Sequence, residues 1–147
     1  MKFLIVLISF YAIIDISFCP KSPRMVLHFS YDGNKSESLK KIKDLLLSQK
    51  YKIKQYDSNE GFLITEYKYF EWGTGERMLA MIVDIDDKIT ILGKGKMAIP
   101  VASLGEDKDL LKIKKLDRLP YKVQKKIFLT IISSMDSLGY KRINRWP

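Results

Sequence analysis

The chain is poor in the side chains that most enzyme sites require. It has 147 residues but only one cysteine and one histidine, which excludes an internal disulfide, a CxxC redox pair and a cysteine-rich zinc site. It also contains no GxSxG, HExxH or Walker pattern, which mark common hydrolases, metalloproteases and nucleotide-binding loops. We therefore expect no catalytic activity, no cofactor and no bound metal.

Three short patterns are similar in composition to functional motifs. His28 lies in an alternating stretch without a second histidine, so we expect a strand residue that is partly packed or faces a helix. Asp84, Asp86 and Asp87 supply oxygen atoms but lack the calcium-loop pattern, and we expect turn and solvent-face residues. Residues 93–96 (GKGK) lie within a strand pattern, which predicts a bulge or tight twist with lysines that still help bind anions.

Positive charge is concentrated near the C-terminus. The chain carries 26 Lys and Arg against 17 Asp and Glu, a formal charge of +9. From residue 108 onward there are eleven Lys and Arg but three Asp, so eight of the nine net charges lie there. Such a run is either a solvated surface or a surface that attracts anionic headgroups or an acidic partner. For the second alternative the candidate residues are Lys112, Lys114, Lys115, Lys122, Lys125 and Lys126.

The sequence has no apolar run of the roughly 20 residues that a membrane-spanning helix needs. The apolar stretch from Phe3 to Ile14 follows the positive Lys2. Its length fits the roughly 7–15 residues of the apolar part of a signal peptide. We predict a signal peptide over residues 1–19, a short linker over residues 20–24, and a single domain over residues 25–147.

The single cysteine ends this N-terminal segment. Ile16-Ser17-Phe18-Cys19 resembles the lipobox of bacterial lipoproteins at the Ile and Ser positions, whereas Phe18 departs from it because the residue before the cysteine is normally small. The resemblance implies that the thiol of Cys19 is acylated, and two or more acyl chains hold a protein stably at a membrane without a spanning helix. Plain secretion and an uncleaved hydrophobic anchor are the alternatives.

The apolar periodicity of residues 25–140 predicts an α+β domain. Alternation at period two indicates strands, and apolar spacing of three and four residues indicates helices. The expected order is a strand at 25–31, a helix capped by Asn34 or Ser36 and reaching Gln49, strands at 51–56, 62–70, 77–85 and 88–99, and a helix from Pro120 to Gly139. Residues 107–116 are a candidate for a further short helix. We expect a four- to five-stranded antiparallel sheet covered on one face by the two helices.

One part of this pattern is similar to a known family. Tyr51-x-Ile53 leads to Asp57 and then to Gly61-x-Leu63-x-Thr65. This order of a helix, an extended segment, an acidic turn and an alternating strand resembles the helix-grip domains of small envelope lipoproteins, including the BamC-type component of the outer-membrane β-barrel assembly machinery. The resemblance implies a non-catalytic partner or scaffold role and supplies no catalytic residue.

The expected function is a binding or assembly module of the cell envelope, anchored through Cys19. Its expected partners are a membrane, anionic lipid and an envelope protein, and not a nucleic acid, because a signal peptide takes the chain away from nucleic acids. A basic nucleic-acid-binding module is one alternative, with Tyr67, Tyr69, Phe70 and Trp72 as a stacking platform. A small secreted or periplasmic enzyme is the other.

Overall fold

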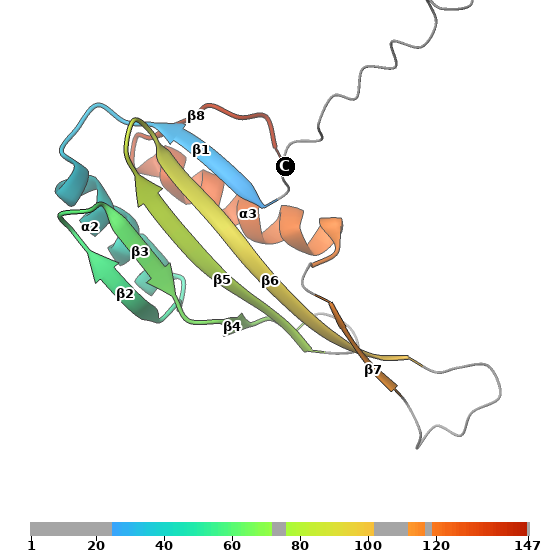
Figure 1. Cartoon of the computed structure of the whole chain (residues 1–147). Coiled ribbons are helices and arrows are strands. Elements are labelled where there is room, and N and C mark those ends of the chain that lie inside the picture. Colours follow the sequence, from blue (N-terminus) through green and yellow to red (C-terminus); the bar gives the residue numbers. More distant parts are fainter. Residues whose placement is uncertain (1–24, 72–75, 102–111, 117–118, 147) are drawn as a thin grey trace, which may run out of the picture.

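The computed structural model describes residues 25–71, 76–101, 112–116 and 119–146 (Figure 1). Ten elements follow one another along the chain. They are β1 (Val26–Ser30), α2 (Lys35–Ser48), β2 (Ile53–Asp57), β3 (Phe62–Thr65), β4 (Lys68–Tyr69), β5 (Glu76–Ile85), β6 (Ile89–Val101), β7 (Lys112–Leu116), α3 (Tyr121–Ser137) and β8 (Lys141–Arg142).

The strands form one antiparallel sheet in the order β2-β3-β5-β6-β1-β8, with β4 paired to β5 and β7 paired to β6. Both helices lie on the same face of the sheet (Figure 1), and their apolar sides join the inward residues of the strands in one core. The prediction of an α+β fold with an antiparallel sheet and two helices is confirmed. Over the residues described, the sheet already has eight strands, so the expected number of four to five is wrong.

Local sequence explains the first half of the domain. In β1, Leu27 and Phe29 are fully buried, as the alternation predicts. Asn34 is the N-cap of α2, and its side chain accepts a hydrogen bond from the Glu37 backbone N–H at 3.2 Å. The apolar stripe of α2 is buried against the sheet. Its buried members are Leu39, Ile42, Leu45 and Leu46.

The helix α3 approaches the sheet closely because β6 contains glycine where α3 crosses it. A Cβ atom at Gly93 would lie 2.6 Å from Phe128 Cζ, and one at Gly95 would lie 2.8 Å from Leu119 Cγ. The β5–β6 pairing runs without a register shift through both glycines. The predicted bulge is therefore wrong. Glycine stands at both positions because a side chain there would collide with α3 or with the turn before it.

The segment predicted as a short helix at 107–116 forms a strand over its described part. Lys112–Leu116 pairs with Met97–Val101 of β6, while residues 107–111 lie outside the described residues. β1 pairs with β6 only as far as Leu92, which lies opposite Val26. Beyond Leu92, this edge of β6 has no partner in β1. An open edge presents unpaired backbone groups, and β7 satisfies them there.

The C-terminal tail closes the other edge of β1. After β8, the Asn144 side chain accepts a hydrogen bond from His28 N at 2.9 Å and donates one to Val26 O at 2.8 Å. The ring of Trp146 packs edge-on against Phe128 with centroids 5.1 Å apart. Beyond β8, the Asn144 side chain thus bonds to the β1 backbone as a neighbouring strand would, and Trp146 covers part of the core.

We expect Gly93→Ala to lower the free energy of unfolding by about 1–3 kcal/mol, the usual cost of overpacking a core. The added carbon forces either the Phe128 ring or α3 to move. Urea denaturation measures the loss. Gly33→Ala is the matched control, because its added carbon meets no atom closer than 3.7 Å; equal stability of the two variants would contradict the close packing of α3 on β6.

Candidate functional site

A β-bulge determines which side chains face the helices near β4. Ile64 pairs with Ile82 of β5, and Lys68 pairs with Leu79. Between these two pairs, residues 65–67 therefore oppose residues 80–81 of β5. Three residues opposite two is the geometry of a bulge. Because the pleat alternates, one extra residue moves the following side chains to the opposite face. Lys68 consequently shares the face of Leu79, which lies in the core.

The hydroxyl of Thr65 supports this bulge. Thr65 is buried, and its Oγ1 accepts a hydrogen bond from Met81 N at 2.8 Å and donates one to Glu66 O at 2.9 Å. A side chain thus takes the place of the backbone acceptor that a regular ladder would supply. The prediction of one continuous strand over 62–70 is wrong for this reason.

The C-terminal end of α2 brings a tyrosine to the same place. Lys50 has a left-handed backbone with φ of 64°, and Tyr51 N and Lys50 N donate to Leu46 O and Leu47 O, each at 2.9 Å. This pattern is a Schellman motif, which usually places glycine at the left-handed position. The chain turns sharply there and directs Tyr51 into the core.

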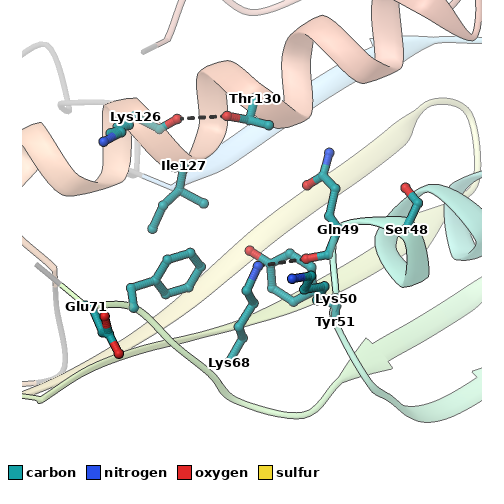
Figure 2. A pocket seen from close by; sticks show the side chains of 10 residues that line it. Ser48, Gln49, Lys50, Tyr51, Lys68, Glu71, Lys126, Ile127 and Thr130 are labelled. Atoms are coloured by element: carbon teal, nitrogen blue, oxygen red, sulfur yellow. Dashed lines mark hydrogen bonds between the residues drawn. The ribbon is translucent and has the colours of Figure 1, made fainter.

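A cleft of about 440 Å³ lies where α2 ends, beside β4 and the middle of α3 (Figure 2). Gln49 Nε2 donates to Ser134 Oγ at 3.0 Å and ties the end of α2 to α3 beside it. We call this cleft the interhelix cleft. Its lining residues are Ser48, Gln49, Lys50, Tyr51, Lys68, Phe70, Glu71, Lys126, Ile127 and Thr130.

Lys68 is the central charge of the interhelix cleft. Its Nζ donates to Gln49 O at 2.7 Å, at the C-cap of α2, and lies 4.8 Å from the Tyr51 ring centroid and 5.0 Å from that of Phe70. Burial lowers the pKa of the Lys68 ammonium, and the nearby positive charge of Lys50 lowers it further. Burial also raises the pKa of the Tyr51 hydroxyl, so this phenol stays neutral at physiological pH.

The basic residues selected from the sequence fall into two groups. Lys112, Lys114 and Lys115 belong to β7. Lys122, Lys125 and Lys126 are exposed along the first half of α3, and Lys126 also lines the interhelix cleft. The predicted signal peptide (1–19) with the lipidation candidate Cys19, and the predicted linker (20–24), lie outside the described residues.

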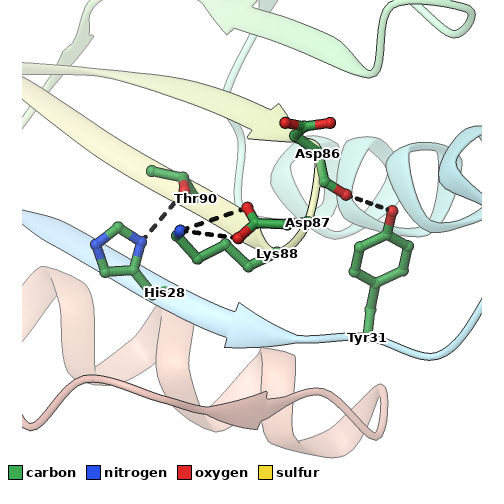
Figure 3. Close-up of polar contacts among 6 residues, drawn as sticks. All are labelled: His28, Tyr31, Asp86, Asp87, Lys88 and Thr90. Atoms are coloured by element: carbon green, nitrogen blue, oxygen red, sulfur yellow. Dashed lines mark hydrogen bonds and ion pairs between the residues drawn. The ribbon is translucent and has the colours of Figure 1, made fainter.

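His28 and the acidic cluster take structural positions (Figure 3). His28 Nδ1 lies 3.2 Å from Thr90 Oγ1 on the neighbouring strand, on the face of the sheet opposite to Leu27 and Phe29. It is partly packed, as expected, but does not face a helix. The hydroxyl of Tyr31 donates to Asp86 O at 2.8 Å.

The three aspartates are exposed and follow the expected turn and solvent-face pattern. Lys88 Nζ lies 3.3 Å from Asp87 Oδ2, and Asp84 and Asp86 are also exposed. Within the described residues no group of three or more His, Cys, Asp or Glu side chains is arranged to hold a metal ion. In the same part of the chain, neither helix is long and apolar enough to cross a membrane.

The aromatic residues considered for base stacking do not act as one platform. Tyr67 is partly buried beneath Lys96, whose Nζ lies 4.6 Å from the ring centroid. Tyr69 is 66% exposed, whereas Phe70 contacts Lys68 on the helix-covered side. Trp72 lies outside the described residues.

Sequence reasoning missed the three residues at the centre of the cleft, Tyr51, Lys68 and Phe70. Simple alternation from Leu63 and Thr65 places Tyr67 and Tyr69 inward, and the bulge reverses this. The one available indication was Lys68 itself, a lysine inside a run of aromatic and β-branched residues. Its role needed the pairing of β4 with β5, which local pattern does not give.

We expect Thr65→Val to lower the free energy of unfolding by about 1–3 kcal/mol, because the buried Met81 N–H then has no acceptor. The shape of the side chain is nearly unchanged, so packing contributes little. Urea denaturation measures stability, and hydrogen exchange at Met81 reports the bond directly. Thr65→Ser keeps the hydroxyl and should retain protection of that amide; equal protection in both variants would contradict the bridging role of Thr65.

Comparison with known proteins gives no relative from which a function can be carried over. No family model matches the chain, and no curated protein matches it. The case for a function therefore depends on the geometry and chemistry of its own residues.

Proposed function

We propose that this protein is a non-catalytic binding or assembly module of the cell envelope, held at a membrane through Cys19. The apolar stretch of residues 3–14, followed by Cys19, supports export and a lipid anchor. The observation that carries the proposal is that the start of the described domain lies on the same side as the lysines at the end of α2 and the start of α3.

Carboxylates gather where three turns meet. The β1–α2 loop, the β2–β3 turn and the β5–β6 turn are joined by the bond from Tyr31 to Asp86 and by Ile85 N donating to Gly61 O at 2.9 Å. We call this region the acidic end. Its carboxylates are Asp32, Asp57, Glu60, Asp86 and Asp87.

Lysines gather at the opposite end, where α2 finishes and α3 begins. We call this region the basic end. Its lysines are Lys50, Lys52, Lys68, Lys122, Lys125 and Lys126, which outnumber the carboxylates Glu66 and Glu71 beside them. Each lysine close to an anionic membrane contributes about 1 kcal/mol to binding, so the basic end is the part of the domain that an anionic surface attracts.

The domain is attached to its N-terminal segment on the basic side. β1 runs from Val26 toward the acidic end, where Tyr31 contacts Asp86. Met25 therefore lies toward the basic end, and its carbonyl accepts a hydrogen bond from Gly93 N at 2.7 Å, beside the contact of Gly93 with Phe128 of α3. A lipid anchor on this side raises the local concentration of the lysines at the membrane surface.

The placement of lysines on α3 is not explained by helix stability. The N-terminus of a helix carries partial positive charge and is stabilised by acidic side chains. The first turn of α3 has no acidic residue and Pro120 provides no side-chain cap, while Lys122, Lys125 and Lys126 follow within two turns. An anionic surface near this end would offset the repulsion.

The likeness to helix-grip envelope domains supports the same proposal. The four matching residues shape one hairpin: Asp57 Oδ1 accepts from Asn59 N and Glu60 N at 3.0 and 3.1 Å, Gly61 has a φ of 80°, Leu63 is buried, and Thr65 supports the bulge. These roles are structural. We infer a partner or scaffold role from the likeness and no chemistry.

We expect the protein to bind phosphatidylglycerol vesicles with an affinity that falls steeply as salt is added, because the attraction is electrostatic. Lys122→Gln/Lys125→Gln should weaken binding by about 2 kcal/mol, roughly 30-fold, in a vesicle co-sedimentation assay. Lys40→Gln/Lys141→Gln is the control with the same charge change near the acidic end. Salt-independent binding, or equal loss in both double variants, would contradict the proposed orientation.

We expect the protein isolated from its own cells to begin at Cys19 and to carry acyl chains there. Mass spectrometry of the N-terminal peptide reports the cleavage site and the modification together. Cys19→Ser should leave the domain folded but move it from the detergent phase to the aqueous phase on Triton X-114 partition. A native chain that starts at Met1, or an unmodified Cys19, would refute the lipid anchor.

A further inference from the structure

We propose that the interhelix cleft binds one anionic amphiphile, a molecule with a carboxylate or phosphate group joined to an apolar tail. This inference goes beyond the envelope role, because it concerns an internal site and needs neither the lipid anchor nor Lys122 and Lys125 of α3. It depends on the shape of the cleft, its apolar floor and the sign of its charges.

The cleft has the size and lining of a small-molecule site. Its volume of about 440 Å³ falls within the roughly 300–1,000 Å³ that is typical of ligand pockets. The buried side chains Tyr51 and Ile127 and the partly buried Phe70 supply its apolar surface. An apolar tail lying on these residues would bury its surface away from water. A wholly polar ion has no apolar surface to bury and would gain nothing from them.

The charges of the lining favour an anion. Among the ten lining residues are the cations Lys50, Lys68 and Lys126, against the single carboxylate Glu71. Burial lowers the pKa of Lys68, and the positive charge of Lys50 lowers it further, so the two ammonium groups repel each other. An anion between them would remove that repulsion.

Lys68 is positioned to donate to such an anion. A lysine ammonium has three N–H donors, and the bond to Gln49 O uses one of them. The ammonium also lies near the rings of Tyr51 and Phe70, where a cationic ligand would otherwise bind. The protein's own cation thus occupies the aromatic site, which disfavours a cationic ligand and leaves donors for an anionic one.

A partly buried arginine, Arg77, lies outside the cleft lining but next to the lining residue Phe70. Phe70 N donates to Arg77 O at 2.8 Å, and the two residues face each other across β4 and β5, so their side chains lie on the same face of the sheet. Within the described residues, Arg77 Nε and Nη1 are buried without a hydrogen-bond partner. Unpaired buried donors are uncommon and require an explanation; a nearby anion would compensate this charge.

The test measures dodecanoate binding to the whole chain by isothermal titration calorimetry, below the micellar concentration. We expect saturable binding of one molecule per chain. Dodecanol and dodecyltrimethylammonium have the same tail without the negative charge, and should bind at least about tenfold more weakly, because a charge-assisted hydrogen bond is lost. Equal affinity for dodecanol and dodecanoate would overturn the proposal.

Two substitutions locate the binding to the cleft. Lys68→Met keeps the apolar stem and removes the charge, and we expect at least about a tenfold loss of affinity. Its matched control is Lys43→Met, because Lys43 Nζ lies 4.6 Å from the Tyr56 ring centroid in a similar contact outside the cleft, and affinity should not change.

Lys50→Gly separates binding from folding. Glycine is favoured at the left-handed position of Lys50, so the melting temperature should be unchanged or higher, while the affinity for dodecanoate falls several-fold. Unchanged affinity in both Lys68→Met and Lys50→Gly would overturn the proposal. The vesicle assay changes Lys122 and Lys125 instead, so either proposal can fail without the other.

A second anion distinguishes the source of the ligand. Monomeric lysophosphatidylglycerol carries a phosphate head and dodecanoate a carboxylate. If lysophosphatidylglycerol binds more tightly, the site is assigned to a membrane lipid. If dodecanoate binds more tightly, the site is assigned to a free fatty acid. Both results support the site, and the absence of binding by either compound overturns it.

Discussion

The hydrogen bond from Met81 N to the Thr65 hydroxyl is the constraint on which the candidate site depends. It lets the edge of the sheet accommodate one extra residue between β3 and β4 without leaving a buried amide unpaired. Because of that residue, Lys68 and Phe70 face the helices and Tyr69 faces solvent. A regular strand would have put Tyr67 and Tyr69 on the helix-covered face and kept Lys68 out of the interhelix cleft.

The cleft also depends on how closely the helices lie on the sheet. Gly93 and Gly95 allow α3 and the turn before it to touch β6 directly. The Schellman motif at the end of α2 turns Tyr51 into the core, and Gln49 joins this end of α2 to Ser134 of α3. Between these contacts the helices leave a cavity with an apolar floor, which Lys68 enters from the sheet.

Charge is separated along the same direction as the strands. Turn residues at the acidic end carry carboxylates, while the end of α2 and the start of α3 carry lysines. Lys68 belongs to both the fold and the site, since it donates to the carbonyl of the C-cap residue Gln49 and brings positive charge into the cleft. A lysine with a favourable structural contact can therefore also provide the donor that an anionic ligand requires.

The sequence by itself determined the fold class, the apolar faces of β1, α2 and α3 and the concentration of positive charge, because each depends on residues a few positions apart. It narrowed the cap of α2 to Asn34 or Ser36, and the structure selected Asn34. Only the tertiary structure decided the bulge after Thr65, the pairing of Lys112–Leu116 with β6 and the role of Asn144 at the edge of β1. Those features depend on backbone groups left unpaired by distant strands. The central position of Lys68 was likewise decided by the tertiary structure, since only its pairing with Leu79 of β5 shows which face of the sheet its side chain takes.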